Sequence, residues 1–183
     1  MRLTFALPFA LPFALLTLLP GAALADDAKP AVDLVTAFVT GATDGATLAF
    51  GGGQAVAVMK QTGPGLFEGQ TNNNGPLVDF AITEKSDCVF DIVFSLGKQA
   101  QGGIELDAHK LKAVTYALAA EKDGYTDWSI TLEGTDASVV QGLAPDGTLA
   151  PAQNTSIIST SLKDTDMQAD VAEFQKTYCP AAV

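Results

Sequence analysis

One four-residue motif in this sequence has the residue types and spacing of a serine acyl enzyme. Ser95 and Lys98 match the S-x-x-K pattern, in which the lysine accepts the proton of the attacking serine hydroxyl. Only two of the four positions are fixed, and the S-D-N and K-T-G motifs of those enzymes do not accompany it here. We therefore interpret Ser95 and Lys98 as a chance match.

His109 is the only histidine of the sequence, and it could act as a general base. Asp107 lies two residues before it, so a histidine–carboxylate dyad can be drawn. The surrounding segment is polar, which favours the alternative of an exposed histidine at a bulge or turn. A zinc site would need several histidine or cysteine ligands, and one histidine cannot supply it if both cysteines form a disulfide.

Carboxylates are the remaining candidates for chemistry. Asp164, Asp166 and Asp170 crowd the predicted start of the last helix and could hold a hard cation. Calcium needs six to eight oxygens in a loop, and the spacing is not that of an EF-hand, so favourable charge at a helix N-terminus is the simpler interpretation. Pairs of carboxylates suited to glycoside hydrolysis cannot be recognised without their spatial separation. The sequence thus assigns no catalytic, cofactor-binding or metal-binding residue, and we expect no cofactor.

The N-terminal segment has the three parts of a secretory signal peptide. Arg2 gives a basic start, residues 3–19 are almost wholly apolar, and small residues precede a predicted cleavage between Ala25 and Asp26. An uncleaved membrane anchor is the alternative. The apolar run of 17 residues is at the lower limit for crossing a bilayer, and prolines interrupt it. Cleavage is therefore the favoured interpretation.

Loss of residues 1–25 would leave residues 26–183, a size typical of one globular domain. We expect this domain to lie in the periplasm or outside the cell. No other hydrophobic stretch approaches membrane-spanning length, so we expect no transmembrane segment after the signal is removed.

The exported part is strongly acidic and contains no arginine. It carries 21 acidic residues against nine basic ones, which gives a formal net charge of −12. Nucleic-acid binding depends on dense positive charge and on the planar fork of arginine. We therefore exclude nucleic acid as a partner.

Cys88 and Cys179 are the two cysteines, and export predicts that they form a disulfide because both the periplasm and the extracellular space are oxidising. The bridge would close a loop over 91 positions, for which the loop-entropy model gives roughly 4 to 5 kcal/mol. A catalytic thiol is the alternative, but neither cysteine belongs to a C-x-x-C pair.

From about residue 47 to residue 162, short apolar runs of period two alternate with turn signals, which predicts an antiparallel meander. A change of parity after Leu106 predicts a bulge or turn near residues 107–110. The expected strands are residues 55–61, 66–70, 78–82, 88–96, 104–106, 114–118 and 128–132, with hairpins at 63–65 and 122–124. Residues 139–140 and 156–159 are two further candidates.

Two helices are expected to cover the sheet. Pro30 and Gly41 bound a short helix over about residues 30–40. A C-terminal amphipathic helix begins with Asp164 or Thr165 as its cap, Thr165 and Gln168 have capping-box spacing, and its apolar stripe is Met167, Val171, Phe174 and Tyr178. The predicted fold is therefore α+β: a mainly antiparallel meander sheet of about six to eight strands, packed against these two helices.

A well-organised domain without a recognisable catalytic set favours a non-enzymatic function. We expect an exported binding or accessory protein that holds a partner protein or a small apolar ligand through its sheet. The alternatives are a small cell-envelope hydrolase that uses carboxylates or His109, and a structural or stress-related envelope protein.

Overall fold

A computed structural model describes residues 29–72, 74–97 and 99–180. The predicted signal peptide and the predicted cleavage between Ala25 and Asp26 lie outside these residues, as does Lys98. The described part has two helices and twelve strands in two antiparallel sheets, and the α+β prediction is confirmed. Neither helix in this part has the length and apolarity needed to span a bilayer.

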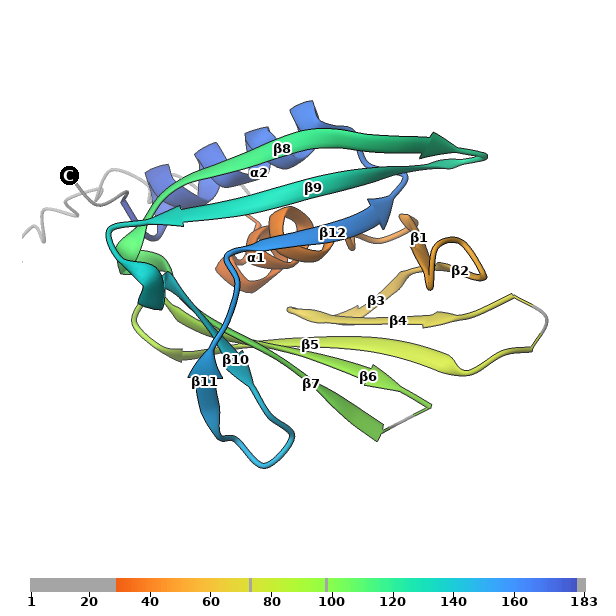
Figure 1. Cartoon of the computed structure of the whole chain (residues 1–183), viewed down its shortest axis with the longest axis horizontal. Helices are drawn as coiled ribbons and strands as arrows, with labels where there is room; N and C mark the ends of the chain where they lie inside the picture. The colour runs from red at the N-terminus through yellow and green to blue at the C-terminus, as the bar shows by residue number, and fades with distance from the viewer. Residues whose placement is uncertain (1–28, 73, 98, 181–183) are drawn as a thin grey trace, which may run out of the picture.

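Both sheets contain strands from distant parts of the chain (Figure 1). The five-stranded sheet has the order β2-β1-β12-β9-β8, and the seven-stranded sheet has the order β11-β10-β7-β6-β5-β4-β3. The elements are α1 (Ala31–Thr40), β1 (Thr47–Phe50), β2 (Ala55–Val58), β3 (Lys60–Gly63), β4 (Leu66–Gln70), β5 (Leu77–Ser86), β6 (Val89–Leu96), β7 (Gln99–Asp107), the 3-10 turn η1 (Ala108–Lys110), β8 (Leu111–Lys122), β9 (Tyr125–Gly134), η2 (Ala137–Val139), β10 (Val140–Leu143), β11 (Leu149–Pro151), β12 (Thr155–Thr160) and α2 (Asp164–Thr177).

The number of strands exceeds the six to eight expected, partly because residues 55–61 belong to both sheets. β2 pairs with β1 in the five-stranded sheet, whereas β3 pairs with β4 in the seven-stranded sheet. The change of sheet occurs at Met59, whose backbone exchanges hydrogen bonds with Gly45 and Ala46 and whose side chain is buried. The expected hairpin around residues 63–65 therefore forms only between β3 and β4.

The chain leaves the seven-stranded sheet where the apolar parity changes. β7 ends at Asp107, η1 follows, and β8 begins the long hairpin with β9 in the other sheet. The N–H of Ala108 donates to the carbonyl of Cys88 at 2.8 Å, which ties η1 to the turn between β5 and β6. The turn predicted near residues 107–110 is thus the point at which the chain moves between sheets.

Helix α1 lies between the two sheets, and its residues 34–40 are all buried (Figure 1). Gly41 ends it with a φ of +71°. A side chain at this position would place a Cβ 2.7 Å from the Cβ of Thr160 in β12, so both the backbone conformation and the close approach require glycine. The hydroxyl of Thr160 donates to the carbonyl of Gly41 and fixes this junction.

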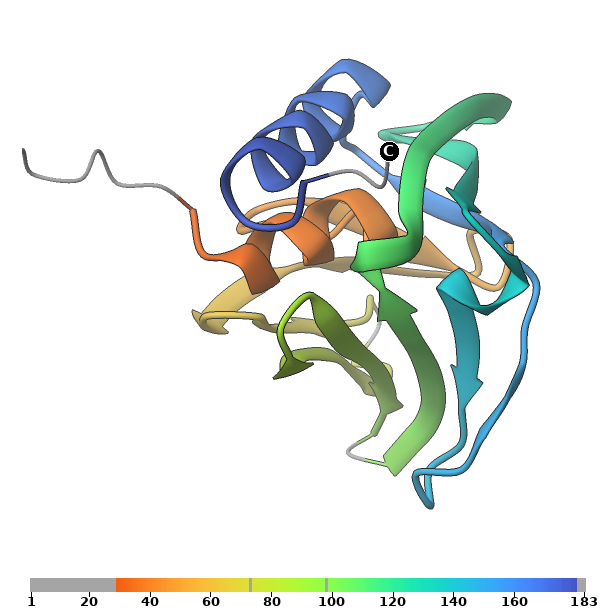
Figure 2. The ribbon, with the colours of Figure 1, turned by 90° about the vertical axis from the view of Figure 1, so that its left-hand side faces the viewer.

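Helix α2 packs beside α1, and Figure 2 shows the two helices one above the other on the same side of the molecule. Met167, Val171 and Phe174 of the predicted stripe are buried. The predicted capping box is wrong: the N-cap is Lys163, without a side-chain cap. The helix begins two residues earlier than that box requires, and Gln168 instead donates to the carbonyl of Val114 in β8 at 3.0 Å.

The helices and both sheets share one hydrophobic core, with three phenylalanines of α1, α2 and β6 in it. Phe174 packs edge-on against Phe38 of α1 and Phe90 of β6, with ring centroids 5.4 and 5.7 Å apart. Beside this cluster the structure contains a disulfide between Cys88 and Cys179, both of which are buried. The bridge joins the turn between β5 and β6 to the end of α2.

Candidate functional site

A cavity of about 450 Å³ lies between the two sheets, beyond the C-terminal end of α1. The five-stranded sheet contributes residues of β1, β9 and β12, and the seven-stranded sheet contributes residues of β5, β6, β7 and β10. Val39 and Thr40 close the inner end, because α1 stops there and the chain turns away at Gly41. The cavity is thus the part of the space between the sheets that the helix does not fill.

Three phenylalanines from three strands form one wall of the cavity. Phe94 of β6 stacks on Phe50 of β1 at a centroid distance of 6.0 Å and packs against Phe80 of β5 at 5.6 Å. All three rings are only partly buried and line the hollow. An apolar molecule placed here would cover aromatic surface that the fold leaves open.

Gly102 enlarges the cavity because it lies directly opposite Phe94 in the pairing of β6 with β7 and carries no side chain. Its φ is +110°, a region that residues with a side chain rarely adopt. A Cβ there would also lie 3.0 Å from the carbonyl oxygen of Leu143. The aliphatic side of the cavity is made by Ile92, Ile104, Leu132, Val140 and Ile158.

The mouth of the cavity is lined mainly by polar, uncharged residues, together with the exposed side chain of Ile157. Gln101, Gln153, Asn154 and Ser156 are exposed there, and Gln101 donates to the carbonyl of Gln99. None of the described residues that line the cavity is charged. The site can therefore bury an apolar body and offer hydrogen bonds, without an ion pair, to a group at its entrance.

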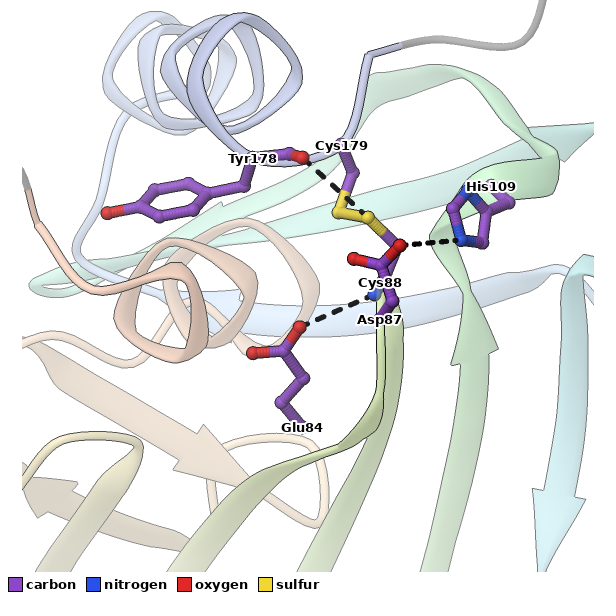
Figure 3. A network of polar contacts seen from close by, with 6 residues as sticks. All are labelled: Glu84, Asp87, Cys88, His109, Tyr178 and Cys179. Carbon is purple, nitrogen blue, oxygen red and sulfur yellow. Dashed lines mark hydrogen bonds and ion pairs between the residues drawn. A yellow bond between two sulfur atoms is a disulfide. The ribbon is translucent and has the colours of Figure 1, made fainter.

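His109 contacts Asp87 and not Asp107. Its Nε2 lies 3.7 Å from Oδ2 of Asp87, which is in the turn between β5 and β6, as Figure 3 shows. Asp107 is instead paired with Lys110 at 3.1 Å. The partner differs from the expected one because the contact of Ala108 with Cys88 brings η1 against this turn. Both His109 and Asp87 are exposed.

Ser95 and His109 lie far apart. Ser95 pairs with Asp79 near the end of β6, whereas His109 lies beside the beginning of that strand. Seven residues of strand from Cys88 to Ser95 correspond to about 20 Å. The structure therefore does not bring these two candidate catalytic residues together.

The three carboxylates Asp164, Asp166 and Asp170 of α2 do not form one cluster either. Asp164 and Asp166 lie in the first turn, while Asp170 is buried and accepts a hydrogen bond from Lys29 at 2.7 Å. This hydrogen bond is the main cause that raises the pKa of Lys29. Within the described ranges, the grouping of potential metal ligands consists of Asp87, Cys88 and His109, so the acidic start of α2 is not such a group.

Two carboxylates lie side by side on the outer face of the seven-stranded sheet. Asp91 of β6 is directly opposite Glu105 of β7, and Lys85 forms an ion pair with Glu105. Burial raises the pKa of Asp91, with a further upward contribution from Glu105 and an opposing one from Lys85. Oδ1 of Asp91 is buried without a hydrogen-bond partner.

Sequence analysis did not identify the cavity, because none of its residues belongs to a catalytic motif. The available signal was a glycine pair, Gly102-Gly103, just before the predicted strand at residues 104–106, which marks a close approach or a missing side chain. Phe80 and Phe94 belong to the predicted strands at residues 78–82 and 88–96, but the sequence does not show that their rings border a hollow. Comparisons with protein-family models, curated proteins and solved structures found no match for this chain.

Proposed function

We propose that this protein is a non-enzymatic binding protein that holds a small, neutral and mainly apolar molecule between its two sheets. The observation that carries this proposal is the cavity of about 450 Å³ bordered by Phe50, Phe80 and Phe94. Its volume falls in the range of small-molecule sites, roughly 300 to 1,000 Å³, and such sites combine apolar walls with a few polar groups.

The lining limits the chemistry of the ligand. Aromatic and aliphatic side chains at the inner end favour a ring system or a short branched hydrocarbon portion. A charged group would lack an opposite charge among the described lining residues and would have to give up its hydration there. A hydroxyl, carbonyl or amide group can bond to Gln153, Asn154 or Ser156 at the mouth.

The proposed place of action is the periplasm or the extracellular space. The signal-peptide pattern of residues 1–25 motivates this location, and a disulfide is suited to an oxidising compartment. Cell fractionation followed by mass determination of the exported chain tests the location. A mature N-terminus at Asp26 is the expected result.

Ligand binding is tested by titrating the purified protein with N-phenyl-1-naphthylamine, a neutral probe whose fluorescence rises in apolar surroundings. Ile158→Phe adds volume inside the cavity, and we expect probe affinity to fall at least about tenfold, which corresponds to about 1.4 kcal/mol. Ile158 lines the cavity and is partly buried.

Leu118→Phe is the matched control, because Leu118 is 57% exposed on β8 and does not line the cavity. Its affinity for the probe should equal that of the unaltered protein. Circular dichroism and thermal unfolding establish that both variants are folded. Saturable binding that is equally strong in both variants, or no saturable binding at all, would refute the cavity as the site.

A further inference from the structure

A second cluster of chemically reactive side chains lies at the opposite end of the molecule from the cavity. Asp87 and Cys88 form the turn between β5 and β6, His109 lies in η1, and Cys179 follows α2 (Figure 3). The ligand atoms of Asp87, Cys88 and His109 all lie within 4.8 Å of one another. The sulfur of Cys179 is bonded to that of Cys88 and therefore lies at the same place.

These four side chains are the ligand types that zinc prefers. Zinc takes thiolate sulfur, imidazole nitrogen and carboxylate oxygen in a tetrahedral arrangement, commonly with two cysteines and two other ligands. In the disulfide the two sulfurs cannot act as thiolates, and His109 and Asp87 alone make an incomplete set. Reduction changes this, because it yields two thiols beside the imidazole and the carboxylate.

We propose that the reduced form of this protein binds one Zn²⁺ ion through Cys88, Cys179, His109 and Asp87. A dithiol reductant gives two electrons and two protons to the disulfide and becomes a disulfide itself. Zinc then binds as the two thiols release their protons, and it occupies the place between the two sulfurs and the exposed pair. The metal thus replaces the disulfide as the link between α2 and the seven-stranded sheet.

Contacts other than the disulfide hold the four groups in place. The N–H of Ala108 bonds to the carbonyl of Cys88, which keeps η1 and His109 beside the turn. The N–H of Cys179 bonds to the carbonyl of Phe174, whose ring packs on Phe90. These contacts do not depend on the sulfur–sulfur bond, so the thiols remain near His109 and Asp87 after reduction.

The test uses Co²⁺ as a coloured substitute for Zn²⁺ and follows the visible absorption of tetrahedral cobalt bound to thiolates. The full protein is reduced with a dithiol, which is removed without oxygen before titration. We expect one Co²⁺ per chain, displacement by Zn²⁺, and no such absorption in the oxidised protein. His109→Ala should weaken binding at least about tenfold, since removal of even an outer-shell partner weakens metal binding 10- to 100-fold.

Glu84→Gln is the control, because this carboxylate accepts a hydrogen bond from the N–H of Cys88 without belonging to the cluster. Its Co²⁺ affinity should be unchanged. A second measurement is the thermal unfolding of the reduced protein, whose midpoint Zn²⁺ should raise in the unaltered chain and not in Cys88→Ser/Cys179→Ser. Cobalt binding that does not depend on His109, or no tetrahedral absorption in the reduced protein, overturns the proposal.

Discussion

The space between the two sheets is filled at one end and hollow at the other. At the filled end, Phe174 contacts both Phe38 and Phe90, and all three side chains are completely buried. At the hollow end, Phe94 contacts both Phe50 and Phe80 in the same way, but these three side chains border a cavity of about 450 Å³. The same kind of side chain thus serves a close-packed core in one region and an open wall in the other.

The length of α1 accounts for the difference. Its ten residues reach only part of the way along the sheets, and Gly41 turns the chain back toward β12. Side chains of α1 and α2 fill the space up to that point, and no helix of the described part continues beyond it. A fold that needed only stability would gain by filling the remaining space, so the hollow end is where we expect the function to reside.

The largest expected effect is the difference in stability lost when a phenylalanine ring is removed at each end. Phe174→Ala should lower the free energy of unfolding by about 3 to 5 kcal/mol, because the ring is surrounded and the site cannot collapse. Phe94→Ala should cost only about 1 to 2 kcal/mol, because one side of this ring already faces a cavity. Urea denaturation of both variants measures the difference. Equal losses would mean that the hollow end is packed in solution.

The disulfide should stabilise the filled end without affecting the cavity. Cys88→Ser/Cys179→Ser is expected to lower the free energy of unfolding by about 2 to 4 kcal/mol, because the open loop gains conformational freedom in the unfolded chain. Probe affinity should stay within about twofold, since the bridge lies at the opposite end. A large loss of probe binding in the folded variant would contradict the separation of the two ends.

Lys29→Met tests the edge of the filled end, where α2 meets the start of the described chain. Asp170 is 6% exposed, and its ion pair with Lys29 would be lost. Because the Lys29 side chain is 56% exposed, water replaces part of the interaction. We therefore expect a loss of about 1 kcal/mol, below that of a fully buried pair. Asp170→Asn removes the buried charge that Lys29 balances, so it should lower stability less than Lys29→Met does. Thermal unfolding of both variants measures the difference.

The smallest expected effect on stability concerns Asp91, which lies on the outer face of β6, away from the space between the sheets. Its pKa is raised in the folded protein, mainly by burial, so the folded state binds its proton more tightly than the unfolded state. Protonated Asp91 therefore contributes fully to stability at a pH below the ordinary pKa of aspartate. This contribution is lost as the pH rises through the raised pKa that Asp91 has in the folded protein. Asp91→Asn should remove this decline, as urea denaturation at a series of pH values would show.

Local patterns predicted much of the fold. The helix over residues 31–40, the hairpin of β8 with β9 and the turn after Leu106 were visible as apolar periodicity bounded by Pro, Gly and polar residues. The division into two sheets was not visible, because the change at Met59 occurs inside an uninterrupted strand-like run. Tertiary contacts with Gly45 and Ala46 decide it, and no local signal encodes them.

The candidate sites were harder to predict than the fold. Pairing of the cysteines followed from their number, but the position of His109 depends on a contact between η1 and a turn about twenty residues earlier. The cavity arises from the distance at which α1 stops between the sheets. Both are properties of packing, and the sequence pattern reports only which side of each strand is apolar.

The position of β12 has a consequence for the timing of folding. This strand joins β1 to β9, so the five-stranded sheet cannot be completed until the ribosome has released nearly the whole chain. Cys179 is made 91 residues after Cys88. At about 5 to 20 residues per second, roughly 5 to 20 seconds pass in which Cys88 has no partner thiol. A chaperone that binds the nascent chain would have to keep the Cys88 thiol from pairing wrongly during that interval.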